Sequence, residues 1–71
     1  MAITIKAARV NKNLTQAEAA ELLGITKDSL WNYENHRSYP DIRVVQKMVE
    51  VYGIPYDQLI FYQEITIKPI I

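Results

Sequence analysis

Hydrophobic positions in the first third of the chain predict two short helices separated by a turn. A first helix is expected over residues 4–12, with Ile5 and Ala8 facing inward. Asn13 follows it, and asparagine tolerates the left-handed backbone conformation that ends many helices. The motif TQAE then opens residues 15–23 and has the capping-box pattern, in which a Thr hydroxyl and a Glu carboxylate cap the same helix start. We therefore expect a second helix over this range.

The same kind of pattern predicts two further helices. Gly24 can adopt positive φ at no steric cost, and Thr26 is a suitable cap for a third helix over residues 26–34. Asp41 is the expected cap of a fourth helix, which Gly53 closes. Apolar residues in this fourth helix have the three-to-four spacing of a buried stripe: Ile42, Val45, Val49 and Tyr52.

The period of the pattern changes near the C-terminus. Pro55 fits the first turn of a short fifth helix over about residues 55–61. Isoleucines then alternate with polar residues over 65–68, which predicts a strand, and Pro69 limits that strand to an edge position. The tail has three possible roles: it pairs as a strand across a dimer, packs back on the first and fifth helices, or remains flexible. Pairing would also cover an edge strand that is otherwise prone to aggregate.

Length and composition exclude several classes of protein. With 71 residues there is room for one domain, expected over residues 1–61, followed by a tail over 62–71 that is a possible dimerisation strand. The absence of Cys rules out disulfides and thiolate metal sites, and one His with scattered carboxylates predicts no metal centre or cofactor. Apolar runs are too short to span a membrane and no secretory signal is evident, so a cytoplasmic location is expected. Hydrophobic content of 49% indicates an apolar surface covered by a partner.

Charge is balanced, with eight basic and eight acidic residues and a formal net charge of zero. Binding to nucleic acid without sequence preference depends on net positive charge, so the balance counts against it. Any surface that binds phosphate must therefore be built locally.

The strongest functional signal lies between residues 16 and 35. Two short helices that cross through a tight turn require a small residue at the crossing, a turn residue with positive φ and an apolar anchor on the second helix. Ala20, Gly24 and Leu30 meet these three requirements in order. This is the geometry of a helix-turn-helix, which projects its second helix into the major groove of DNA.

These residues carry a resemblance to a known family. The motifs TQAE, LGIT and YEN, followed by a proline, make residues 3–60 similar to the Cro/CI-type (XRE) helix-turn-helix of phage repressors. The resemblance implies an all-α fold, namely a five-helix lambda-repressor-like DNA-binding domain, here followed by a short C-terminal extended or β segment. It also implies binding of double-stranded operator DNA as a homodimer.

The resemblance further assigns roles to matching residues. Gln16 corresponds to a glutamine that touches a phosphate and braces the recognition helix, and His36 occupies a position that is usually Gly, so the loop there is expected to be strained or differently shaped. Arg9 and Glu34 match an ion pair that ties the first helix to the end of the third. The residues expected at the DNA backbone are Gln16, Thr26, Asn35 and Arg37.

The outward face of the third helix follows from its inward anchor. If Leu30 faces the core, the opposite face carries the expected base-reading residues: Lys27, Asp28, Trp31 and Asn32. A lysine reaches guanine acceptors or a phosphate, and an asparagine pairs with adenine. Asp28 either accepts from a cytosine amino group or is a favourable charge in the first helical turn. Trp31 either presses on a thymine methyl or sugar, or packs over Lys27 or Tyr39 on the protein surface.

Two functions remain open from the sequence. The first is a small transcriptional regulator, a prophage repressor that binds a palindromic operator. The second is a protein-binding module such as an antitoxin, which the neutral charge and apolar tail permit. An enzyme is not expected, because no nucleophile–His–carboxylate set, phosphate loop or metal spacing is present, and a chain of this length leaves no room to sense a small molecule.

Overall fold

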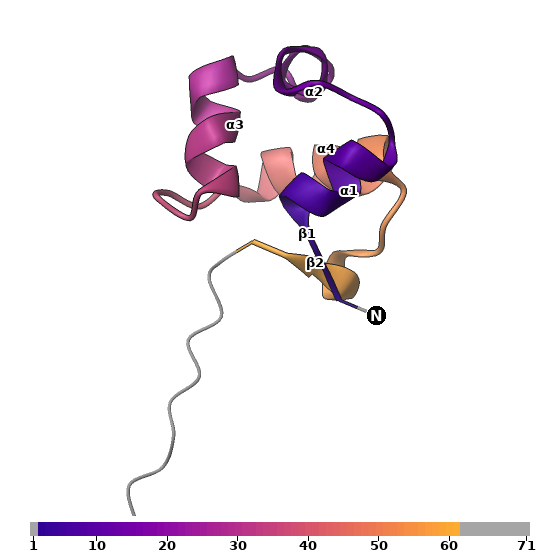
Figure 1. Ribbon diagram of the computed structural model, residues 1–71. Coiled ribbons are helices and arrows are strands. Elements are labelled where there is room, and N and C mark those ends of the chain that lie inside the picture. The colour runs from indigo at the N-terminus through magenta and orange to yellow at the C-terminus, as the bar shows by residue number, and fades with distance from the viewer. Residues whose placement is uncertain (1, 62–71) are drawn as a thin grey trace, which may run out of the picture.

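The computed structural model describes residues 2–61 and is mostly helical. Within this range four α-helices surround one core, and a pair of two-residue strands closes one end (Figure 1). The elements in chain order are β1 (Ile3–Thr4), α1 (Ile5–Asn11), α2 (Gln16–Leu23), α3 (Lys27–Glu34), α4 (Ile42–Tyr52), the 3-10 turn η1 (Tyr56–Gln58) and β2 (Leu59–Ile60).

Each α-helix begins at a side chain that satisfies one of its free backbone N–H groups. The oxygens of Thr4, Thr15 and Thr26 accept from the backbone N–H three residues later, at 3.1, 3.1 and 3.0 Å. Asp41 does the same for α4 at 3.1 Å. The predicted capping box of α2 is confirmed, because the Glu18 carboxylate also accepts from the Thr15 backbone N–H at 2.9 Å.

All four α-helices end near a residue with left-handed backbone, Gly53 after α4 among them, and three of the helices share the same turn. Asn13, Gly24 and His36 have φ of +59°, +72° and +60°. After each of them the next N–H reaches back across the final turn, from Leu14 to Arg9 O, from Ile25 to Ala20 O and from Arg37 to Asn32 O. This is the Schellman pattern, and it reverses the chain sharply between helices. The prediction for Asn13 is confirmed, and His36 takes the conformation of the glycine usual at its position.

The core is formed where the four helices meet. Leu30 of α3 and Ala19 of α2 have no exposed surface, and Ile5 and Ala8 of α1 are each 1% exposed, as predicted. Small side chains on α2 allow α3 to pack closely against it. The buried apolar residues of the cluster are Ile5, Ala8, Ala19, Ala20, Leu23, Leu30, Met48, Tyr52 and Leu59.

The predicted fifth helix over residues 55–61 is confirmed only as a single 3-10 turn, η1. Pro55 has an extended backbone with ψ of 148°, and the turn follows it. The chain then enters β2, which pairs in parallel with β1, Ile3 opposite Leu59 and Thr4 opposite Ile60. This pairing places the Leu59 side chain in the core, where it is 6% exposed. Burial of Leu59 favours the strand over a short surface helix.

The predicted buried stripe of α4 is correct only in part. Val45 and Tyr52 are buried and Val49 is half-buried, but Ile42 is 63% exposed. Met48 is completely buried instead, because positions 45, 48 and 52 form the face that meets the other helices. Ile42 therefore adds apolar surface to the outside of α4.

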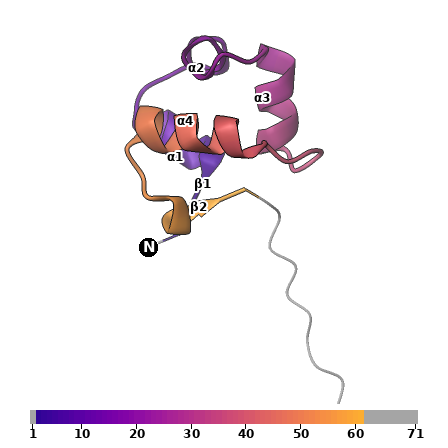
Figure 2. The ribbon, with the colours of Figure 1, turned by 180° about the vertical axis from the view of Figure 1, so that it is seen from behind.

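The two ends of the domain differ in character. Figures 1 and 2 show α2 and α3 at one end and the strand pair, with the N-terminus, at the opposite end. No helix within residues 2–61 is long and apolar enough to cross a membrane. The strand predicted over residues 65–68 lies outside the described residues.

Candidate nucleic-acid interface

Helix α3 presents a mixed polar face on the side opposite its buried anchor. Leu30 is completely buried, while Lys27, Asp28 and Trp31 are exposed and Asn32 is half-buried. Four accessible side chains of different chemistry thus lie along one helix: a cation, a carboxylate, an indole and an amide. Asp28 and Asn32 lie farthest around the helix from Leu30, and Lys27 lies at the edge of this face. In the major groove of DNA, base pairs present hydrogen-bond acceptors, amino donors and the thymine methyl group, and these four side chains can interact with such groups.

The start of α3 is fixed by a small hydrogen-bond cluster. Thr26 Oγ1 accepts from the Ser29 N–H at 3.0 Å, and its own hydroxyl donates to Ser29 Oγ at 2.9 Å. The Thr26 hydroxyl is therefore engaged in capping. Asp28 lies in the first helical turn, where a negative charge interacts favourably with the helix dipole.

The end of α3 is tied to α1 and α2 by a buried ionic network. Arg9 Nε donates to Glu34 Oε2 at 2.7 Å and Arg9 Nη2 to Glu34 Oε1 at 3.1 Å, which makes the pair bidentate. Side-chain exposure is 10% for Arg9 and 1% for Glu34. Gln16 Nε2 also donates to Glu34 Oε1 at 2.9 Å, and Arg9 Nη1 donates to the Leu14 carbonyl at 2.8 Å. Three helices are thereby held in one orientation, which fixes the direction of α3.

Tyr52 lies beneath this network. Burial and, to a smaller extent, the charge of Glu34 raise the pKa of its phenol to about 12, while the charge of Arg9 acts in the opposite direction. Its hydroxyl has no hydrogen-bond partner within the described residues. Tyr52 is therefore a core aromatic that remains neutral, and it is not a proton donor for chemistry at physiological pH.

The turn after α3 brings two predicted contact residues back onto the helix. Asn35 Nδ2 donates to the Trp31 carbonyl at 2.9 Å, and the Arg37 N–H donates to the Asn32 carbonyl at 2.9 Å. The Arg37 guanidinium carbon lies 5.3 Å from the centroid of the Trp31 ring. Trp31 thus stacks with Arg37, not with Lys27 or Tyr39 as the surface-packing alternative held. Trp31 and Arg37 are six residues apart, which is not a spacing that brings side chains together on a helix, so the sequence did not predict this contact.

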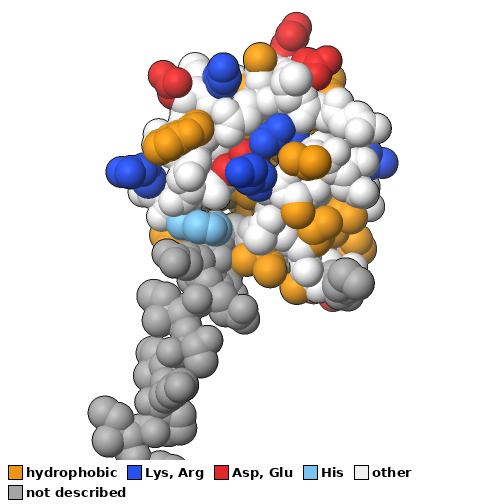
Figure 3. All heavy atoms as spheres, viewed as in Figure 1, with side chains coloured by type: hydrophobic (Ala, Val, Ile, Leu, Met, Phe, Trp, Pro, Cys, Tyr) orange, Lys and Arg blue, Asp and Glu red, His pale blue; other side chains and the backbone are white. Residues whose placement is uncertain are grey.

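Charges on the face of the molecule seen in Figure 3 do not form one basic patch. Figure 3 shows Lys and Arg side chains that occur singly or in small groups between acidic, hydrophobic and uncharged ones. This distribution agrees with the zero net charge. Attraction to a polyanion at long range is correspondingly weak, so binding would depend on contacts at short range.

No group of three or more His, Asp or Glu residues among residues 2–61 has the arrangement of a metal site.

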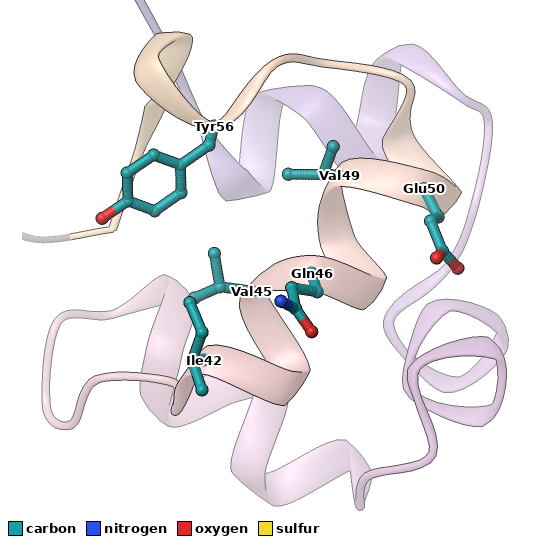
Figure 4. Close-up of a pocket in the computed structure, with 6 residues that line it drawn as sticks. All are labelled: Ile42, Val45, Gln46, Val49, Glu50 and Tyr56. Atoms are coloured by element: carbon teal, nitrogen blue, oxygen red, sulfur yellow. The ribbon is translucent and has the colours of Figure 1, made fainter.

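A second surface feature lies on α4 and η1. A shallow groove of about 490 Å³ is lined mostly by apolar side chains (Figure 4). Ile42 and Tyr56 at this groove are 63% and 61% exposed, and the Tyr56 ring packs near Phe61 with centroids 5.8 Å apart. The lining residues are Ile42, Val45, Gln46, Val49, Glu50 and Tyr56. Apolar side chains gathered in this way mark a surface suited to a protein partner.

Comparison with known proteins agrees with this geometry. The family model described as "Helix-turn-helix" matches residues 5–59, a span that includes all four α-helices. The chain is 32% identical over 63 residues to the cryptic phage CTXphi transcriptional repressor RstR of Vibrio cholerae, covering 89% of this chain and 57% of RstR. It is 36% identical over 64 residues to the HTH-type transcriptional regulator ImmR of Bacillus subtilis, covering 90% of this chain and 50% of ImmR.

A match to a third relative likewise covers most of this chain and about half of the relative. The SPbeta prophage-derived uncharacterized HTH-type transcriptional regulator YonR of Bacillus subtilis is 30% identical over 56 residues, which cover 79% of this chain and 52% of YonR. The chain thus spans about half the length of these curated relatives. No solved structure gives a significant match.

Proposed function

This chain belongs to the helix-turn-helix family of the Cro/CI (XRE) type, and from that membership we propose that it is a sequence-specific, DNA-binding transcriptional regulator that acts as a prophage repressor. One observation carries the proposal: the outward face of α3 bears Lys27, Asp28 and Asn32, while Leu30 and Glu34 lock its inner face into the domain. A helix presented in this way has the dimensions to enter the major groove.

Each polar residue on α3 has a chemical partner on a base edge. Lys27 donates to guanine O6 and N7, and the Asn32 amide donates to N7 and accepts from N6 of adenine. Asp28 accepts from the cytosine amino group, and its negative charge penalises any docking that brings it against a phosphate. Trp31 is exposed beside them on the same helix. Sequence preference would come from this set.

Contacts to the DNA backbone set the position of α3 in the groove. Gln16 keeps amide capacity beyond its bond to Glu34, and Thr26 lies at the N-terminal end of α3, where backbone N–H groups favour anions. Asn35 and Arg37 lie in the turn at the other end of the helix. Four phosphate contacts would therefore flank the base-reading residues: Gln16, Thr26, Asn35 and Arg37.

A homodimer completes the proposal. Two copies would place two α3 helices in successive major grooves, about 34 Å apart, at a palindromic operator. The apolar groove of α4 and η1 supports a dimer because Ile42 and Tyr56 would otherwise expose large apolar surfaces. Residues 62–71 remain a predicted dimerisation strand. Repression would follow from occupation of a promoter.

Selection from a pool of randomised duplexes tests this function. The protein should enrich an inverted repeat whose half-sites are about 10 base pairs apart, since the two recognition helices of a dimer repeat at one helical turn. A variant with Asn32→Ala should enrich a sequence that is degenerate at one position of each half-site. Enrichment of a single half-site would contradict the dimer, and absence of enrichment at low salt would contradict DNA recognition altogether.

A further inference from the structure

Within α3, Trp31 is the one large hydrophobic side chain that is exposed, and a cation lies against its ring. Trp31 is 43% exposed, and the Arg37 guanidinium carbon is 5.3 Å from the centroid of its ring. This separation is within the roughly 6 Å at which an aromatic quadrupole attracts a cation. Resting on the DNA-binding function above, we infer that Trp31 is a positioning residue whose indole holds Arg37 ready to bind a DNA phosphate.

The backbone of the turn fixes the pair. His36 takes φ of +60°, which turns the chain back toward α3, and the Arg37 N–H bonds to the Asn32 carbonyl at 2.9 Å. The carbonyl of Trp31 is held by the side chain of Asn35, also at 2.9 Å. Both partners therefore start from anchored backbone positions. The turn geometry thus places the two side chains within reach of each other.

The contact leaves the charge of Arg37 available. Between residues 2 and 61, the carboxylates that form ion pairs bind Arg9 and Lys47, and none binds Arg37. No hydrogen bond of the Arg37 side chain occurs among residues 2–61, so its guanidinium N–H donors are available there for the fork that matches two phosphate oxygens. Arg9 differs, because Glu34 and the Leu14 carbonyl occupy its donors. Arg37 is thus an oriented cation with free donors beside the base-reading face.

Such an arrangement matters most in a protein without net charge. Bulk attraction to DNA is weak at zero net charge, so affinity depends on contacts that need little reorganisation on binding. An arginine that is stacked before binding has less side-chain freedom to lose. Trp31 should therefore act on affinity and on salt dependence through Arg37, while Lys27, Asp28 and Asn32 determine which bases are preferred.

Binding of a short random-sequence duplex, followed by fluorescence anisotropy between about 50 and 200 mM salt, tests the coupling. Trp31→Ala should weaken binding about two- to fivefold, the size of a cation–π contact at an exposed site. Arg37→Ala should weaken it at least as much and reduce the salt slope by about one. Once Arg37 is alanine, Trp31→Ala should change affinity less than about twofold, and Trp31→Phe alone should stay near wild type because it keeps the ring. Lys27→Ala is the matched control. In the double variant Lys27→Ala with Trp31→Ala, the two fold-changes in affinity should multiply, because Lys27 does not act through Arg37.

A readout on the free protein separates this inference from the function on which it rests. In the wild type and in Trp31→Phe, NMR should show Arg37 side-chain protons shifted upfield by the ring, and Trp31→Ala should remove that shift while far-UV circular dichroism stays unchanged. The inference is overturned if the shift is absent, if the two alanine effects multiply independently, or if Trp31→Phe is as weak as Trp31→Ala. A shifted Arg37 in a protein that binds no duplex at low salt would instead overturn DNA binding, and with it the phosphate role of the pair.

Discussion

The buried pair of Arg9 and Glu34 offers the most informative test of how α3 is held. Glu34 Oε1 and Oε2 together accept from Arg9 Nε, Arg9 Nη2 and Gln16 Nε2. Replacement of Glu34 by Leu leaves the Arg9 guanidinium without a counter-charge at a site where its side chain is only 10% exposed. Replacement of Arg9 by Met leaves the Glu34 carboxylate, 1% exposed, in the same condition.

The expected loss of stability is large for a domain of this size. An uncompensated charge at a buried pair costs about 3–5 kcal/mol. At roughly 0.05–0.15 kcal/mol per residue, 71 residues give a free energy of unfolding of about 4–11 kcal/mol. Each single variant should therefore lose at least a quarter of its stability, and Tm should fall by about 4–8 °C for each kcal/mol.

The double variant distinguishes a charge effect from a loss of packing. With Arg9→Met and Glu34→Leu together, no charge is left buried, and the remaining cost is the hydrogen bonds lost by Gln16 and by the Leu14 carbonyl, about 1 kcal/mol each. The double variant should thus be more stable than either single variant and within about 2 kcal/mol of wild type.

Urea unfolding followed by far-UV circular dichroism measures all three variants at one pH. Lys47→Met is the matched control, because Lys47 and Glu50 form an exposed pair at 3.8 Å with side-chain exposures of 54% and 71%. Its effect should stay within about 0.5 kcal/mol. Single variants that lose less than about 1 kcal/mol, or a double variant as unstable as the weaker single variant, would refute the argument from buried charge.

Three further predictions follow from single residues. Gly24→Ala should cost about 1–2 kcal/mol of unfolding free energy by urea titration, because φ is +72° while no atom lies within 4 Å of the added Cβ; a loss close to zero would show that the turn relaxes. In the wild type, stability should decrease as pH rises from about 10 toward 12, because the pKa of Tyr52 is raised in the folded state and the phenol of the unfolded chain ionises first. Tyr52→Phe should abolish this decrease, and an unchanged alkaline profile would contradict the prediction. Hydrogen bonds from Thr15 lower the pKa of Glu18, so the wild type loses the stabilisation by this carboxylate as pH falls through the pKa that Glu18 has in the folded protein. Glu18→Gln should therefore show a weaker dependence of stability on pH in acid, and a curve parallel to that of the wild type would contradict the prediction.

Local signals in the sequence predicted much of the fold. Caps at Thr15, Thr26 and Asp41 are chosen by hydrogen bonds over three residues, so the residues near each helix start are sufficient to identify them, whereas Thr4 was predicted only as the first residue of its helix. The strand pair could not be found in this way. It joins residues 3–4 to residues 59–60, and two residues per strand give no alternation that a pattern could reveal. The predicted fifth helix is reduced to a 3-10 turn for the same reason, because long-range pairing prevailed over a weak local preference.

Side-chain partners on the surface were harder to predict than helix positions. The outward face of α3 follows from one buried anchor, Leu30, and a helical period. The partner of Trp31 depends on how the chain reverses at His36, a residue whose left-handed conformation ordinary preferences disfavour. Exposure of Ile42 likewise depends on which face of α4 meets the other helices, and its apolar spacing fitted two faces about equally well.

Affinity for the selected operator-like duplex, measured for the wild type and for Asn32→Ala across a salt series, tests the central claim most directly. The wild type should bind with log K falling linearly as log salt rises. Asn32→Ala should remain folded by circular dichroism, keep that salt slope and lose about 1–3 kcal/mol, roughly five- to 150-fold, on the preferred duplex but not on random DNA. Equal losses on both duplexes, an unfolded variant, or a wild type that binds neither duplex would contradict recognition of DNA by α3.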